Sequence, residues 1–342
     1  MPFHDCIGHH IPIALLQAAV KNKRLAHAYL FHGEEAIGKR LAATRLAQAL
    51  SCEYPPDAER FDSCGACRSC RQIESHTHPD FVIIEPDPEQ ASRQIKIEQV
   101  REIEHQIMYR PLIAERKICL IDDADRMTIG AANALLKTLE EPPDHSLFLV
   151  ISSRPAALPS TIRSRCQSLR FTAPARTQVE AALILKREIS PDDARFLAII
   201  SEGRLGEALT IDVKDTRARQ QELINLVRPQ SLQSIESILS SAETIAKAAR
   251  AQDILAWLAR WIRDLILIQV GGDRDQLLYL DDLRKLESYA QEANTDQLLD
   301  LLREIETTEQ RATRNLNLHM ALETILLRLR DALALTPTRA TA

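Results

Sequence analysis

The chain has 342 residues, of which 45% are apolar and 27% charged, a composition typical of a soluble protein with two or three domains. Its formal net charge of -5 gives no overall attraction to the phosphates of nucleic acid, so any contact with DNA has to be local. The stretch from 254 to 270 is interrupted by Arg260, Arg263 and Asp264 and falls short of a transmembrane span, and the amino terminus lacks the regions of a signal peptide, so we expect a cytoplasmic protein.

Five short apolar runs before residue 174 predict buried strands, because each is bounded by turn residues. They cover residues 28–32, 81–85, 117–122, 147–152 and 167–171. Helical patterns alternate with these runs, and one of them is expected to begin after Thr128 as its N-cap and to end before Pro142. The alternation predicts an α/β domain with a parallel five-stranded sheet and helices on both faces.

The segment from 33 to 40, GEEAIGKR, matches a phosphate-binding loop (P-loop) at every defining position except the last. In such a loop Gly33 and Gly38 let backbone N–H groups approach the phosphates, and Lys39 reaches the terminal phosphates. The last position normally carries a hydroxyl that binds Mg²⁺. Here it is Arg40, which has no acceptor atom and cannot bind a metal. The pattern predicts a nucleotide-binding module that has kept its shape and lost at least part of its chemistry.

Four of the seven cysteines lie close together and end in the spacing C-x-x-C-x-x-C; they are Cys52, Cys64, Cys67 and Cys70. Four thiolates match the tetrahedral demand of structural Zn²⁺, and a cytosolic chain rarely keeps disulfides. An iron–sulfur cluster uses the same ligands and is the main alternative. His76 or His78 could replace one cysteine, but both are expected to be loop residues that lead into Pro79. If four thiolates bind one metal, no coordination position is open to water. The site is therefore expected to hold a loop in place and to catalyse nothing.

The sequence ICLIDDAD at 118–125 ends a predicted strand with two carboxylates. The carboxyl ends of the strands are where an open parallel sheet binds its ligands. Asp122 would orient Mg²⁺ directly or through water, and Asp123 stands where a nucleoside triphosphatase needs a base. Taken alone, ICLIDDAD could be a solvated strand end followed by a turn. Because GEEAIGKR is present in the same chain, a nucleotide site is favoured.

The pattern changes near Pro174, beyond which we find no convincing strand. The predicted domains are a P-loop domain at 1–173 with an inserted cysteine segment at 52–70, a small helical domain at 174–212, a helical domain at 213–335 and a disordered tail at 336–342. The third domain carries amphipathic stripes such as Ile254, Leu258, Ile262 and Leu265.

Two long motifs, ANALLKTLEEPP at 132–143 and SRPAALPSTIRSRC at 153–166, resemble the clamp-loader subunits of the AAA+ ATPases. The cysteine segment, LAHAYLFHG at 25–33, HPDFVIIEPD at 78–87 and NLNLHMALETILLRL at 315–329 narrow the resemblance to the delta prime family of bacterial DNA polymerase III. The resemblance implies an AAA+ domain, a helical lid and a collar that joins five subunits into an open ring. The partners that it implies are the tau/gamma ATPase subunits, the delta subunit, the sliding clamp and, through the assembled ring, primed DNA.

The triplet SRC at 164–166 contains Arg165. In clamp loaders, which this chain resembles, the matching arginine reaches the γ-phosphate of ATP bound to the next subunit, as an arginine finger given in trans. Charge spreads over the γ-phosphate oxygens in the transition state, and a permanently cationic guanidinium stabilises it.

The resemblance also implies roles for three other positions. Hydrolysing relatives carry Glu where this chain has Asp123, and they place an arginine of the lid on the nucleotide at the position of Gly206. Arg204 lies two residues away, a shift that rotates a helical side chain by about 200 degrees, so it is not expected to substitute. Ser152 and Ser153 occupy the region of a polar residue that senses the γ-phosphate.

The favoured hypothesis is a non-hydrolysing stator that helps ATP-dependent loading of the sliding clamp onto primed DNA during DNA replication and donates Arg165. Such a chain would be a subunit of a DNA-directed DNA polymerase holoenzyme, a nucleotidyltransferase, with structural Zn²⁺ and without ATPase activity of its own. Nucleotide binding stays open, because Lys39 and the loop amides remain. The alternatives are an active ATPase subunit of the tau/gamma type and a zinc-containing nucleic-acid-binding protein.

Overall fold

The computed structural model describes residues 2–54, 61–87, 93–226, 232, 234–247, 251–273, 276–277, 279, 283–312 and 318–333. The chain separates into two units, Met1–Thr210 and Ile211–Ala342. The predicted boundary near residue 174 falls inside the first unit. Part of the inserted cysteine segment, residues 55–60, and the predicted tail at 336–342 lie outside the described residues.

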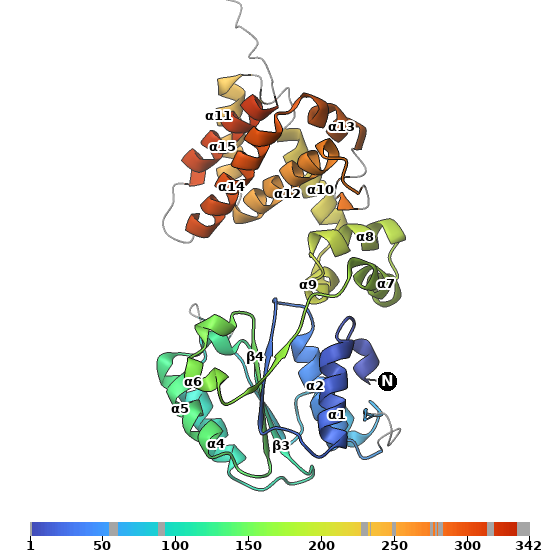
Figure 1. Ribbon diagram of the computed structural model, residues 1–342, viewed down its shortest axis with the longest axis vertical. Coiled ribbons are helices and arrows are strands. Elements are labelled where there is room, and N and C mark those ends of the chain that lie inside the picture. Colours follow the sequence, from blue (N-terminus) through green and yellow to red (C-terminus); the bar gives the residue numbers. More distant parts are fainter. Residues whose placement is uncertain are drawn as a thin grey trace, which may run out of the picture. The chain divides into compact units, whose positions relative to one another are not determined.

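The first unit is built around a parallel sheet (Figure 1). The sheet has five strands in the order β2-β3-β4-β1-β5. The strands are β1 (Ala28–His32), β2 (Phe81–Ile84), β3 (Lys117–Ile121), β4 (Ser146–Ser152) and β5 (Gln167–Arg170). All five strands were predicted, and their ends differ from the prediction by at most one residue. The predicted parallel sheet is therefore confirmed.

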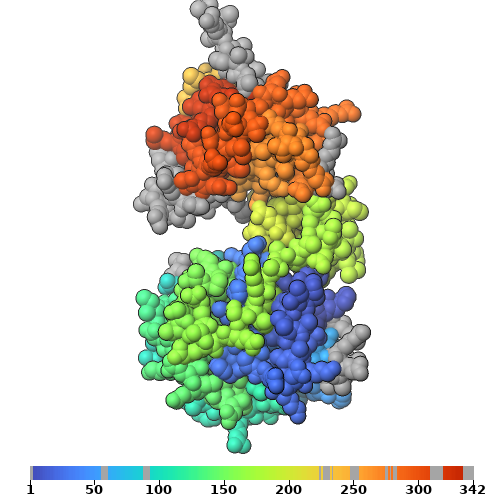
Figure 2. All heavy atoms as spheres, viewed as in Figure 1, coloured from blue at the N-terminus to red at the C-terminus, as the bar shows by residue number. Residues whose placement is uncertain are grey.

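Helices cover both faces of this sheet, as predicted. One face carries α1 (His10–Lys21), α2 (Lys39–Ser51) and α3 (Arg68–Glu74), and the other carries α4 (Ile97–Ile107), α5 (Ile129–Glu140) and α6 (Ser160–Arg163). Neighbouring strand residues serve opposite cores: Phe31 packs with the first set of helices and Leu30 with the second. In the space-filling view the blue residues of α1 and the green residues of α5 lie on opposite sides of the unit (Figure 2).

Helix α5 shows how local sequence sets an element's ends. The hydroxyl of Thr128 accepts a hydrogen bond from the backbone N–H of Ala131 at 3.2 Å, which confirms the predicted N-cap. The helix ends at Glu140, two residues before Pro142, which cannot continue it. Short 3-10 turns also lie in the first unit, among them η1 (Pro2–Asp5), η2 (Ala124–Arg126) and η3 (Pro155–Ala157).

The described residues after β5 form helices and no strand, in agreement with the sequence pattern. The helices α7 (Arg176–Arg187), α8 (Pro191–Ile200) and α9 (Leu205–Thr210) belong to the first unit and are called the lid below. The second unit contains α10 (Val213–Leu226), α11 (Ile235–Lys247), α12 (Ala251–Gln269), α13 (Leu283–Glu292), α14 (Thr295–Ala312) and α15 (Leu318–Ala332). Within the described part of the chain, no helix has both the length and the apolar character needed to cross a bilayer.

Candidate functional site

The P-loop joins the end of β1 to the start of α2, at the carboxyl edge of the sheet. Gly33 adopts φ +149°, and a Cβ added there would lie 2.1 Å from the carbonyl oxygen of Phe171. No other residue fits at this position without moving the backbone of the neighbouring segment. The tight turn that the sequence pattern requires is therefore present.

Lys39 is buried beneath the loop and binds the loop's own backbone. Its Nζ donates hydrogen bonds to the carbonyl oxygen of Gly33 at 2.8 Å, to that of Glu34, and to Oγ of Ser153 at 3.3 Å. Burial lowers the pKa of Lys39, although the nearby carboxylate of Asp122 opposes this shift. The ammonium group that would reach a phosphate is thus held by protein acceptors.

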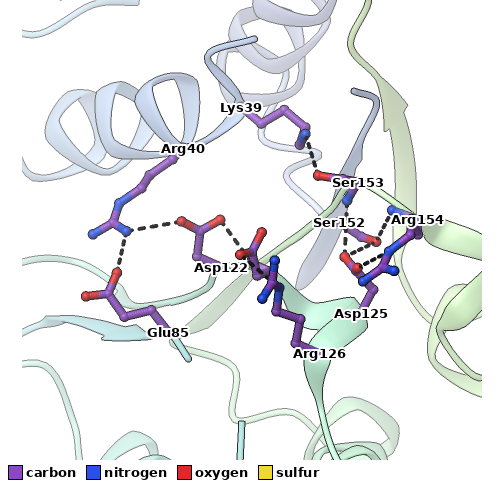
Figure 3. A network of polar contacts seen from close by, with 10 residues as sticks. Lys39, Arg40, Glu85, Asp122, Asp125, Arg126, Ser152, Ser153 and Arg154 are labelled. Atoms are coloured by element: carbon purple, nitrogen blue, oxygen red, sulfur yellow. Dashed lines mark hydrogen bonds and ion pairs between the residues drawn. The ribbon is translucent and has the colours of Figure 1, made fainter. Parts of the chain in front are cut away.

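Arg40 lies between two carboxylates at the ends of neighbouring strands (Figure 3). Its Nη1 donates to Oδ2 of Asp122 at 3.1 Å and to Oε2 of Glu85. Burial acts to lower the pKa of Arg40, but the hydrogen bond to Glu85 and the charge of Asp122 raise it above its usual value. The guanidinium is therefore a cation paired with both carboxylates.

Glu85 was not among the predicted site residues. It directly follows β2, and Asp122 directly follows β3, and these two strands are neighbours in register, with Ile84 paired to Ile121. Two acidic residues after adjacent parallel strands must meet at the same edge of the sheet. The position of Glu85 directly after an apolar strand run was the feature of the sequence that could have identified it as a site residue.

Asp123 has an unusual backbone and stands next to Asp122. Its φ is +46°, its N–H donates to Oδ1 of Asp122 at 3.0 Å, and its Oδ2 lies 3.4 Å from Nε of Arg126. Burial, helped by the charge of Asp122, raises the pKa of Asp123. A cavity of about 330 Å³ opens here, lined by charged side chains and one proline: Glu35, Arg40, Glu85, Pro86, Arg93, Asp122, Asp123 and Arg126.

A second acidic residue missed by the sequence analysis, Asp125, supports the end of β4 (Figure 3). Its carboxylate, only 3% exposed, accepts hydrogen bonds from Oγ of Ser152 at 2.8 Å and from the N–H of Ser153 at 3.2 Å. Nε of Arg154 donates to its other oxygen at 3.0 Å. Burial acts to raise the pKa of Asp125, but these hydrogen bonds outweigh it and hold the pKa below its usual value. The network fixes Ser153 beside Lys39.

The lid touches the P-loop at Gly206. The N–H of Gly206 donates to the carbonyl oxygen of Ala36 at 2.8 Å, and an added Cβ would lie 2.9 Å from that oxygen. Arg204 binds within the lid instead, with Nη1 2.8 Å from Oε2 of Glu207 and Nε donating to the carbonyl oxygen of Ser201 at 3.0 Å. Neither position presents a cation to the P-loop.

The four predicted cysteine ligands come together at the start of α3. The Sγ atoms of Cys52, Cys64, Cys67 and Cys70 all lie within 4.8 Å of one another. Sulfur–sulfur edges of about 3.8 Å follow from zinc–sulfur bonds of about 2.3 Å in a tetrahedron, and the Sγ atoms of Cys64 and Cys70 are 4.0 Å apart.

Backbone N–H groups support the sulfur atoms of this cluster. Sγ of Cys64 accepts from the N–H of Ala66 at 3.4 Å and of Cys67 at 3.3 Å, and Sγ of Cys67 accepts from the N–H of Cys70 at 3.4 Å. Such donors stabilise thiolates, so the donor set suits a metal ion that prefers four sulfur ligands. The cluster is tied to α2 through Nε2 of Gln48, which donates to the carbonyl oxygen of Cys70 at 2.9 Å.

Comparison with known proteins decides the family. The family described as "DNA polymerase III, delta subunit" matches residues 8–175, and "DNA polymerase III, delta subunit, C terminal" matches residues 214–331. The chain is 32% identical over 326 residues to the DNA polymerase III subunit delta' of Bacillus subtilis strain 168. The aligned region covers 93% of this chain and 94% of the relative. The chain belongs to the delta prime family of DNA polymerase III.

Two further relatives bear on this assignment. The subunit delta' of Pseudomonas aeruginosa PAO1 is 30% identical over 270 residues, covering 77% of this chain and 78% of the relative. The subunit tau/gamma of Haemophilus influenzae Rd is 35% identical over 214 residues, covering 61% of this chain and 30% of the relative. The predicted resemblance to clamp-loader subunits of DNA polymerase III is confirmed.

In this delta prime family member, Arg165 lies between α6 and β5, away from the P-loop residues in sequence. Its side chain is 33% exposed, and its Nη2 is 2.6 Å from Oε1 of Glu140. Its Nη1 donates to the carbonyl oxygen of Thr161 at 3.0 Å. The predicted site residues thus form three groups: the P-loop with Asp122, Asp123 and Ser153, the cysteine cluster, and Arg165 by itself.

Proposed function

We propose that this subunit acts in the clamp loader as a stator that does not hydrolyse ATP and that donates Arg165 to the ATP site of a neighbouring subunit. It would thereby help ATP-dependent loading of the sliding clamp onto primed DNA during DNA replication. The observation that carries the proposal is the contact of Arg40 with Asp122 and Glu85.

The argument from Arg40 is electrostatic. Hydrolysis in P-loop proteins needs Mg²⁺ held by the loop hydroxyl and by the carboxylate after the neighbouring strand. Here the hydroxyl is replaced, and a guanidinium already neutralises Asp122. A divalent cation would have to displace Arg40 from both carboxylates and would then lie beside its positive charge.

Two other features of the pocket support the same conclusion. Lys39 is engaged by loop carbonyls, and the lid meets the loop through the backbone of Gly206 without a cationic side chain. Asp123 is one methylene shorter than the Glu that hydrolysing relatives are expected to use as the base. Each departure acts on binding or activation of the triphosphate, so together they favour a pocket that performs no turnover.

Arg165 has the chemistry of an arginine finger. In the neighbouring subunit, water attacks the γ-phosphorus of ATP, the bond to the bridging oxygen breaks, and ADP and phosphate result. A guanidinium placed at the γ-phosphate offsets the charge on the transferring group in the transition state. Arg165 is partly exposed, and a guanidinium has five N–H donors, more than its contacts with Glu140 and Thr161 use.

The proposed partners follow from the family. They are the tau/gamma subunits that bind and hydrolyse ATP, the delta subunit, the sliding clamp and, through the assembled ring, primed DNA. The partition into an AAA+ domain, a lid and a helical collar for subunit association belongs to the same proposal. Zn²⁺ is the proposed occupant of the cysteine cluster, where it would link the inserted segment to α2.

The isolated chain provides the first test. Calorimetric titration with ATP and Mg²⁺, together with a phosphate-release assay, should show no turnover by the purified subunit. Steady hydrolysis by the chain alone would contradict the stator role and would support an active ATPase of the tau/gamma type.

The finger has its own test in the reconstituted loader. Replacing Arg165 with Ala should lower DNA-stimulated hydrolysis at the adjoining site, where an arginine finger contributes on the order of 10³-fold or more. Arg163→Ala is the matched control, because Arg163 is an exposed arginine at the end of α6. Equal rates for Arg165→Ala and the unchanged loader would remove the finger assignment and leave the assignment of Arg40 untouched.

A further inference from the structure

Arg165 is held by two elements that the chain brings together only on folding. Glu140 is the last residue of α5, and Thr161 lies in α6. One terminal nitrogen of the guanidinium is 2.6 Å from the Glu140 carboxylate, and the other donates to the Thr161 carbonyl at 3.0 Å. The side chain is therefore fixed at both terminal nitrogens.

The position of Glu140 is unfavourable for the helix by itself. A carboxylate in the last turn of a helix meets the negative end of the helix dipole. The ion pair with Arg165 offsets that cost. Since Glu140 is half exposed, water screens the pair, and its contribution to folding stability is small and does not by itself account for the arrangement.

What the arrangement supplies is orientation. A free arginine side chain loses rotamer entropy when it is fixed, and that cost would otherwise arise when the finger reaches its phosphate. The two contacts use two of the five N–H donors of the guanidinium, and the remaining donors stay available for an anionic ligand.

We propose that Glu140 is a positioning residue, which pre-orients Arg165 for the γ-phosphate of a nucleoside triphosphate bound to the neighbouring subunit. This inference rests on the proposed finger role of Arg165. In this role Glu140 acts through the guanidinium of Arg165. Its contribution is to kcat, because an orienting contact matters most when charge develops in the transition state.

The experiment uses the complete reconstituted loader with primed DNA and clamp, and measures kcat and KM for ATP. The variants are Glu140→Ala, Glu140→Gln, Arg165→Ala and the double variant Glu140→Ala with Arg165→Ala. Glu141→Ala is the matched control, because Glu141 is the adjacent exposed glutamate and forms no ion pair among the described residues. Thermal unfolding of each isolated subunit checks that the fold is unchanged.

We expect Glu140→Ala to lower kcat by about tenfold with little change in KM, within the roughly 100-fold that misplacing a catalytic group can cost. Glu140→Gln should fall between Ala and the unchanged protein, because its amide oxygen still accepts a hydrogen bond but carries no charge. Glu141→Ala should leave kcat unchanged. The double variant should be no slower than Arg165→Ala alone.

Three results would overturn the inference. If Arg165→Ala slows the loader but Glu140→Ala does not, the finger stands and Glu140 has no positioning role. If Glu140→Ala speeds the loader, or slows it further in the Arg165→Ala background, the carboxylate restrains the finger or acts elsewhere. If Arg165→Ala itself has no effect, the proposed finger role fails first, and the inference about Glu140 fails with it.

Discussion

The cysteine cluster and the nucleotide pocket both derive from recognisable sequence motifs, yet they differ in how their charges are balanced. In the cluster, four sulfur atoms lie within 4.8 Å of one another, and backbone N–H groups donate to two of them. In the pocket, the carboxylates Asp122 and Glu85 already have a cation, Arg40. The cysteine cluster offers four sulfur ligands that could hold a metal ion, whereas the carboxylates of the pocket are already paired with a side chain of the protein.

The largest expected effect breaks the cluster side of this comparison. Replacing Cys67 with Ser should release the metal and lower the free energy of unfolding by at least about 3 kcal/mol, a part of the roughly 10–16 kcal/mol that structural Zn²⁺ supplies in small zinc domains. Elemental analysis and urea unfolding measure both. A strong chelator should bring the unchanged protein to the same stability as the variant. Purified protein without bound zinc or iron would show that the cluster holds no metal.

A smaller effect tests the part of the pocket that keeps its structure. Asp125→Asn should destabilise the first unit by about 1–3 kcal/mol, because the amide cannot accept all the hydrogen bonds of the buried carboxylate. The pKa of Asp125 is depressed in the folded state, so its stabilisation is present above the ordinary carboxyl pKa of 3.8 and is lost as the pH falls through the lower folded value.

Urea unfolding at pH 7 and near pH 3 distinguishes the two forms. The unchanged protein should lose more stability on acidification than Asp125→Asn. Asp144→Asn, at an exposed position before β4, is the control and should behave like the unchanged protein. If Asp125→Asn and the unchanged protein lose the same stability on acidification, the hydrogen bonds of Asp125 do not lower the pKa of its carboxyl group.

The smallest effect on stability, and the sharpest test of the comparison, comes from Arg40→Thr. The half-exposed ion pair should contribute within about 1 kcal/mol to folding, so the fold should persist. The variant supplies the hydroxyl and frees Asp122. Titration calorimetry should then show that the variant binds ATP with Mg²⁺ more tightly than the unchanged chain does.

Arg126→Thr is the matched control for Arg40→Thr, because it also removes a positive charge from the cavity but leaves Arg40 on Asp122. It should not improve binding. If both variants gain affinity equally, the loss of a positive charge from the cavity is enough to explain the gain. The proposal that Arg40 takes the place of a metal ion would then be wrong.

Much of the fold could be predicted because its signals are local. The strand runs, the Thr128 cap and the stop before Pro142 depend on a few adjacent residues, and the structure bears each of them out. The partners of the site residues were harder to predict. Each contact joins residues that are far apart in the sequence: Arg40 with Glu85, Ser152 with Asp125, and Arg165 with Glu140. Such contacts depend on which strands and helices lie side by side.

The sequence by itself determined the residue types: a P-loop ending in an arginine, a set of four thiols, and one arginine in a clamp-loader motif. These follow from short spacings that fix chemistry without knowledge of the fold. The tertiary structure decided what each charge faces. It placed Arg40 between two carboxylates, Gly206 against the P-loop, and Arg165 on Glu140, because the parallel strand order and the helix ends that follow from it bring distant residues within hydrogen-bonding distance.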